Sequence, residues 1–222
     1  MAREVKYAKF ISILEIVYSL FLAVGLATLF REFNLSVLYL CYTIISLLVL
    51  TRFFFAPSKN VEYLINNIYE ANIKPIYKAN YYRIVLLFDI PILFAHAYLF
   101  NLMCSNVGTK TIINYPFFYS FVLLLIINWA WLKLINKRTI KLGNKCSRYL
   151  DFWANNNITF SILMITVLLF GKYYKLIYPK EALMLNNCPL SLSFVGNIAL
   201  MVLAIGNCFR DLWRTYRTYL FH

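Results

Sequence analysis

Long apolar runs, each close to twenty residues in length, alternate with short polar segments along the chain. A bilayer with a hydrocarbon core about 30 Å thick needs roughly 20 apolar residues at the rise of an α-helix. Runs of about this length occupy residues 10–30, 35–56, 84–104, 115–135, 158–177 and 189–209. The pattern predicts an all-α integral membrane protein, folded as a six-transmembrane-helix bundle.

The six runs leave no segment long enough to form a separate soluble core. We therefore expect one membrane domain over residues 1–222. The first run begins at residue 10 and lacks a small-residue cleavage site, so it is interpreted as a retained signal anchor.

The longest polar segment, residues 57–83, contains a second helical signal. Apolar side chains recur at helical spacing between Val61 and Tyr69, which predicts an interfacial helix over about 60–72. Pro75 is expected to end that helix, because proline lacks a backbone donor. An irregular solvated loop is the alternative.

Basic residues predict the orientation of the bundle. With six spans, one side of the membrane receives most of the 22 Lys and Arg, and the other side receives only Arg31, Lys110, Lys172, Lys175 and Lys180. Short loops rich in Lys and Arg stay on the cytoplasmic side, so both termini are predicted to be cytoplasmic. Five or seven spans would erase this asymmetry.

The composition agrees with a membrane protein and adds a strong positive charge. The chain is 62% hydrophobic and 14% charged, with a net charge of +13. Because the basic residues lie beside span ends, this charge favours anionic lipid headgroups or an acidic partner protein and argues against nucleic acid. The many Ile, Asn, Lys, Tyr and Phe residues are typical of a low-GC genome, which favours a bacterial plasma membrane.

Motifs of soluble enzymes are missing from the sequence. It has no CxxC, no Cys or His pair at metal spacing, no glycine-rich phosphate loop and no GxSxG. We expect no enzyme activity, no cofactor and no metal, with an intramembrane enzyme as the alternative. Of the five cysteines, Cys104 and Cys188 both fall on the outer side and are candidates for a disulfide, against two inert thiols.

Ionisable and amide residues inside the spans are the candidate functional residues, because charge in lipid is costly and usually faces the bundle interior. Counting 1.5 Å per residue puts several of them about 8 to 12 Å from the cytoplasmic surface. The candidates are Glu15, Arg52, Asp89, His96 and Asn128.

Within this layer we expect Arg52 to pair with Asp89. Glu15 would then lack a basic partner and would favour its protonated form. His96 lies two turns beyond Asp89 and could extend a proton relay, and Pro91 between them should disturb the helix.

The last span carries its own polar positions. Asn197 and Asn207, with Gly196 and Gly206, suit close contact with another helix. Arg210 and Asp211 follow at its end, where a surface ion pair or lipid contact is expected.

Two functions remain open. The first is a small channel or transporter for protons or a small ion that uses the acid and histidine path, with a homo-oligomer as a candidate assembly. The second is a membrane-embedded interaction or effector subunit whose basic cytoplasmic loops bind a partner protein or anionic lipid. In the second case, the buried charges only lock helices together.

Overall fold

Every element of the computed structural model is helical. It describes residues 2–31, 37–108, 114–142, 148–177 and 192–220. In part of these helices, including the first half of α1, only the backbone is described. The helices are α1 (Ala2–Arg31), α2 (Val37–Glu70), α3 (Pro75–Ile84), the π-helical turn η1 (Val85–Asp89), α4 (Ile90–Ser105), α5 (Tyr115–Lys141), α6 (Arg148–Ile177) and α7 (Leu192–Leu220).

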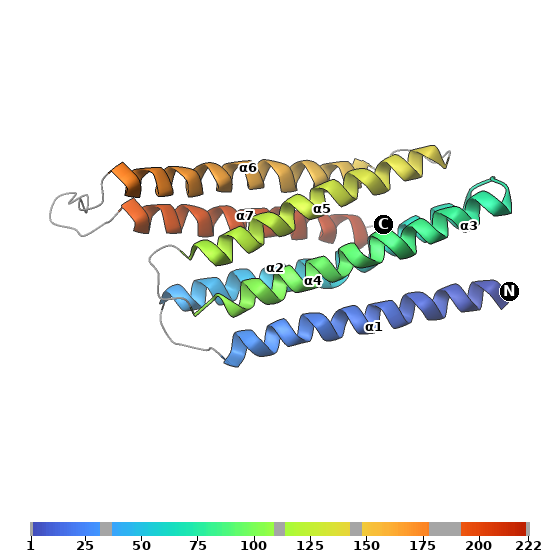
Figure 1. Cartoon of the computed structure of the whole chain (residues 1–222), viewed down its shortest axis with the longest axis horizontal. Coiled ribbons are helices and arrows are strands. Elements are labelled where there is room, and N and C mark those ends of the chain that lie inside the picture. Colours follow the sequence, from blue (N-terminus) through green and yellow to red (C-terminus); the bar gives the residue numbers. More distant parts are fainter. Residues whose placement is uncertain (1, 32–36, 109–113, 143–147, 178–191, 221–222) are drawn as a thin grey trace.

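The helices lie side by side and run alternately in opposite directions (Figure 1). The units α3, η1 and α4 follow one another without a break and form one rod. Neighbouring packing connects α2 to α4, α4 to α5, α5 to α6, α6 to α7, and α7 back to α2. These five rods form a closed ring, and α1 packs on its outside against α4 and α2. Helix α1 begins and α7 ends toward the same end of the bundle.

Four of the described helical segments are long and apolar enough to cross a membrane. They are Ile76–Ser105, Tyr115–Lys141, Leu150–Tyr173 and Val195–Arg214. The described apolar stretches of α1 and α2 are shorter, Ile16–Arg31 and Tyr39–Arg52. The prediction of a helical, multi-pass membrane protein is therefore supported, and the count of six spans stays a prediction.

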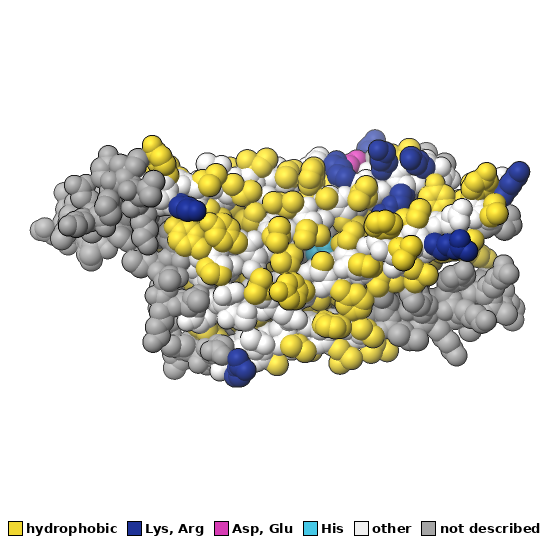
Figure 2. Space-filling view, in the orientation of Figure 1, with side chains coloured by type: hydrophobic (Ala, Val, Ile, Leu, Met, Phe, Trp, Pro, Cys, Tyr) yellow, Lys and Arg dark blue, Asp and Glu magenta, His cyan; other side chains and the backbone are white. Residues whose placement is uncertain are grey.

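Basic side chains gather at one end of the described surface. Figure 2 shows most of the visible Lys and Arg at the end where α1 begins and α5 ends, with an apolar surface between the two ends. Among the described side chains, Arg31 and Lys172 belong to the opposite end.

The helix predicted over 60–72 is present, but it is not a separate element. Helix α2 continues from its apolar run through Pro57 to Glu70. Its last turns bury Leu64, Ile65 and Ile68, so this part packs against the protein. Pro75 then starts α3, where its missing donor costs nothing.

The disturbance expected at Pro91 takes the form of η1. The Ile90 N–H donates to the Val85 carbonyl, one residue further back than in an α-helix. Such π turns are often found at functional sites. This one ends at Asp89, a completely buried carboxylate.

Gly25 explains how closely α1 approaches the ring of five helical rods. A Cβ at Gly25 would lie 2.8 Å from the Phe100 ring and closer still to the Asn101 side chain. Small residues at such contacts let membrane helices pack backbone to backbone.

Candidate functional site

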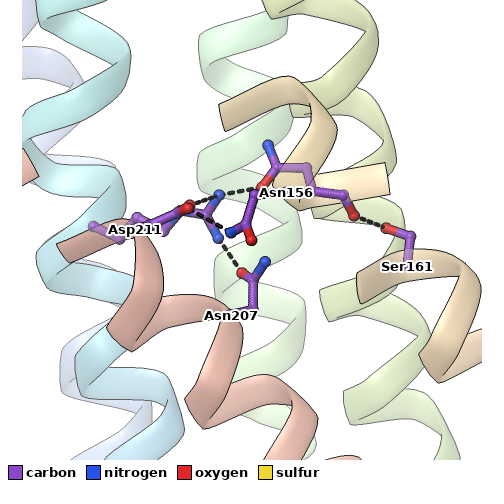
Figure 3. A network of polar contacts seen from close by, with 6 residues as sticks. Asn156, Ser161, Asn207 and Asp211 are labelled. Carbon is purple, nitrogen blue, oxygen red and sulfur yellow. Dashed lines mark hydrogen bonds and ion pairs between the residues drawn. The ribbon is translucent and has the colours of Figure 1, made fainter. Parts of the chain in front are cut away.

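Arg52 is the centre of a buried polar cluster between three helices. Figure 3 shows this cluster, with Asn156, Asn207 and Asp211 labelled. Arg52 projects from α2, is 6% exposed, and forms an ion pair with Asp211 of α7. Its guanidinium also donates to the Oδ1 atoms of Asn207 on α7 and Asn157 on α6. A buried cation is tolerated only when charge and hydrogen bonds are both matched, and this cluster supplies both.

Helix α6 completes the cluster with consecutive amides. Asn156 Nδ2 donates to Asp211 Oδ1 at 2.5 Å, so the carboxylate receives an amide as well as the guanidinium. The Ser161 hydroxyl donates to the backbone carbonyl of Asn157 at 2.8 Å. We call Arg52, Asn156, Asn157, Asn207 and Asp211 the Arg52 cluster.

A second ion pair lies between η1 and α5. Asp89 accepts from Trp131 Nε1 at 2.7 Å and from Arg138 Nη1 at 2.5 Å. The Asp89 side chain is 0% exposed and that of Arg138 is 15% exposed. Only the arginine of this pair reaches toward solvent.

The predicted pairing of Arg52 with Asp89 is therefore wrong. Each of the two has another partner of opposite charge, Asp211 for Arg52 and Arg138 for Asp89. Helix α2 contacts both η1 and α7, but Asp89 is held by Trp131 and Arg138 of α5, whereas α7 presents Asp211 to Arg52.

The expected surface ion pair of Arg210 with Asp211 is also wrong. Asp211 is 2% exposed and faces the interior, whereas Arg210 is exposed. Consecutive residues on a helix are about 100° apart, so one can enter the core while the next faces outward.

Sequence reasoning did not include Arg138 and Asp211 among the candidate residues inside the bundle. Helical spacing nevertheless connects Arg138 to Trp131 of the Asp89 ion pair and Asp211 to Asn207 of the Arg52 cluster. Arg138 is two turns after Trp131, and Asp211 is one turn after Asn207. Each pair lies on one helix face.

His96 lies between the two charged centres. Its Nδ1 lies 2.7 Å from the Ile92 carbonyl, and its ring centroid is 5.6 Å from that of Trp131. Asn128 is next to the imidazole, and Arg52 is close enough to act on it electrostatically. The structure thus brings together four candidates: Arg52, Asp89, His96 and Asn128.

The remaining candidates fall partly outside the described residues. The Glu15 side chain lies outside them, so its partner is not assigned. Cys188 lies outside them too, and Cys104 is a buried thiol in α4. The disulfide between them stays a prediction.

Helices α2 and α7 share a polar seam beyond the Arg52 cluster. The Tyr42 hydroxyl donates to Asn197 Oδ1 at 2.7 Å, ten residues before the contact of Arg52 with Asn207 on both helices. The equal spacing shows that the two helices run parallel and in register over about 15 Å. We call this interface the α2/α7 seam.

Several buried polar atoms along and beside the seam have no protein hydrogen-bond partner within the described part of the chain. They are Thr43 Oγ1, Asn128 Oδ1, Asn157 Nδ2, Asn197 Nδ2 and Asn207 Nδ2. Buried polar atoms are normally satisfied, and internal water serves those that the protein does not. The seam therefore offers hydration sites within an apolar bundle.

Within the described part of the chain, no group of three His, Cys, Asp or Glu side chains comes together to hold a metal ion. Comparison of the chain with known protein families, with curated protein sequences and with solved structures finds no match.

Proposed function

We propose that the chain is a six-span protein of a bacterial plasma membrane, with both termini in the cytoplasm. Six rods of alternating direction and the gathering of Lys and Arg at one end support this topology. Reporter fusions after Asn106, Asn144 and Asn187 test it. They should report outside, inside and outside, and any other pattern contradicts it.

The function proposed for this bundle is proton conduction along the α2/α7 seam. The observation that carries it is the set of buried hydroxyl and amide atoms without protein partners, which runs from the Tyr42 level to the Arg52 cluster. Water bound to such atoms forms a chain along which protons can hop.

Charge in the seam favours protons over metal cations. Asp211 balances Arg52, so no uncompensated negative charge attracts a metal cation there. His96 lies beside the cluster, and its imidazole is the side chain that the proposed path would use as a proton relay.

Proton flux into liposomes tests the proposal. The full chain is reconstituted around a pH-sensitive dye, and a potassium gradient with valinomycin drives protons inward. Wild type should exceed empty liposomes, and His96→Ala or Asn197→Leu should lower the flux at least about tenfold, the effect of about 1.4 kcal/mol on a barrier. Glu15→Gln tests the acid predicted from sequence.

The matched control is Thr166→Val on α6. Thr166 is exposed and bonds to the Ile162 carbonyl of its own helix, so its loss removes a hydroxyl from the outer surface only. It should conduct like wild type. Equal flux from wild type and empty liposomes would eliminate proton conduction.

An interaction subunit is the second candidate, favoured by the exposed basic residues at the proposed cytoplasmic end. They include Lys74, Arg83, Lys137, Lys141 and Arg148. Neutralising Lys137, Lys141 and Lys145 should abolish co-purification of an acidic partner without affecting membrane insertion. Arg138 is left intact because it holds Asp89. Unchanged co-purification would count against this candidate.

A further inference from the structure

Two arginines of α7 are held against one aromatic ring of α6. The guanidinium carbons of Arg210 and Arg214 lie 5.2 and 4.5 Å from the centroid of the Phe152 ring. Cations at such distances are attracted by the ring quadrupole. Phe152 is half-buried and both arginines are exposed, so the ring restrains two guanidinium groups at the protein surface.

Two acids adjoin these residues in sequence, and each has a basic partner. Asp211 lies in the Arg52 cluster, and Asp151 forms an ion pair with Lys133 at 2.7 Å. Four basic side chains, Arg52, Lys133, Arg210 and Arg214, accompany these two carboxylates. This part of the protein therefore keeps a surplus of positive charge.

The same turns of α7 carry aromatic side chains suited to the membrane interface. Phe209 and Trp213 stack with centroids 6.4 Å apart, and they are 63% and 52% exposed. Exposed aromatic rings at the end of a candidate span are typical of the headgroup level. The arginines next to them in sequence would lie at the depth of lipid phosphates.

From this geometry we propose that Phe152, Arg210 and Arg214 form a binding site for the headgroup of an anionic phospholipid. The planar guanidinium fork matches phosphate oxygens in pairs, and two forks one turn apart can hold one phosphodiester. The stacked rings of Phe209 and Trp213 would contact the glycerol and upper acyl chain. The inference rests on the proposed membrane crossing of α7 and not on proton conduction.

Native mass spectrometry of the full chain in detergent tests the site. The affinity of the wild-type protein for phosphatidylglycerol should be at least about tenfold higher than its affinity for phosphatidylcholine. Arg210→Gln with Arg214→Gln should remove this preference. Phe152→Leu keeps both charges and should weaken binding about threefold, because only the ring is lost.

The matched control is Lys137→Gln with Lys141→Gln. These residues are also exposed, lie one turn apart on α5, and give the same change in net charge. Binding by this variant should stay within about twofold of wild type. Equal loss in both double variants would mean general electrostatic attraction and would overturn the site.

Two further outcomes are decisive. Arg210→Lys with Arg214→Lys keeps the charge but loses the planar forks, so it should bind between wild type and the glutamine variant. Wild-type affinity in the glutamine variant would contradict the proposal. Inorganic phosphate alone should not bind, and an equally tight phosphate complex would reassign the site to a free anion.

Discussion

Two arginine–aspartate pairs cross the interior of the bundle, and they differ in how completely they are enclosed. Arg52 and Asp211 are both almost fully buried and are surrounded by three asparagines. In the other pair only Asp89 is fully buried, while Arg138 reaches toward solvent beyond Trp131. The first pair is closed off from bulk solvent, whereas the second can share its charge with bulk water or headgroups.

This difference predicts the largest effect for loss of Asp211. Asp211→Leu leaves Arg52 charged and buried, which should lower the free energy of unfolding by about 3 to 5 kcal/mol. Reversible unfolding by SDS in mixed micelles measures it. Arg52→Met with Asp211→Leu should recover most of the loss, because no buried charge remains.

The control for Asp211 is the third described ion pair. Lys133 and Asp151 are 41% and 35% exposed, so Asp151→Leu should cost no more than about 1 kcal/mol. If both aspartate variants lose the same stability, the Arg52 cluster is not enclosed as described.

Loss of Arg138 should have a smaller effect. Arg138→Gln leaves Asp89 with Trp131 and with access to water at the arginine's position, so we expect a loss of about 2 to 3 kcal/mol in the same unfolding assay. Lys137→Gln, the exposed neighbour, should change stability by less than about 0.5 kcal/mol. A loss as large as that of Asp211→Leu would remove the distinction between the two pairs.

Trp131 sharpens the comparison further. Trp131→Phe keeps an aromatic ring beside His96 and removes the indole N–H from Asp89. A hydrogen bond to a charged group contributes about 1.5 to 3 kcal/mol, and the lower value is expected because Arg138 stays in place. Combining Trp131→Phe with Arg138→Gln should then cost more than the sum of the two. Simple additivity would contradict a shared carboxylate.

The smallest effect is expected at the other end of the α2/α7 seam. Tyr42→Phe removes a neutral hydrogen bond to Asn197, and such bonds between membrane helices contribute about 0.6 kcal/mol. The SDS concentration at the midpoint of unfolding should fall slightly. A loss above about 2 kcal/mol would show that this contact, and not the Arg52 cluster, dominates the seam.

Much of the fold could be predicted from the apolar runs, because run length follows directly from helix rise and bilayer thickness. Each of the six runs overlaps one described helical rod. The runs end where the apolar residues give way to proline or polar residues, however, and several helices continue past them. Helix α2 continues through Pro57 to Glu70 and α5 continues through Arg138 to Lys141, and the sequence pattern placed Pro57 and Arg138 in loops.

The members of the site were easier to predict than their partners. Burial cost alone identifies Arg52, Asp89 and His96, since ionisable groups in spans face the interior. Helix α2 lies beside both acid-bearing elements, so the choice between Asp89 and Asp211 depends on the direction in which Arg52 projects. Hydrophobic periodicity does not contain that information, because every helix of the ring has an apolar outer face.

Double-mutant cycles on the free energy of unfolding test the partner assignment most directly. They compare the coupling of Arg52 with Asp211 and of Arg52 with Asp89, using methionine for arginine and leucine for aspartate. Residues in direct contact couple by up to about 3 kcal/mol, and separated ones by less than about 0.5 kcal/mol. The structure predicts strong coupling to Asp211 and weak coupling to Asp89. Strong coupling of Arg52 to Asp89, with none to Asp211, would contradict it.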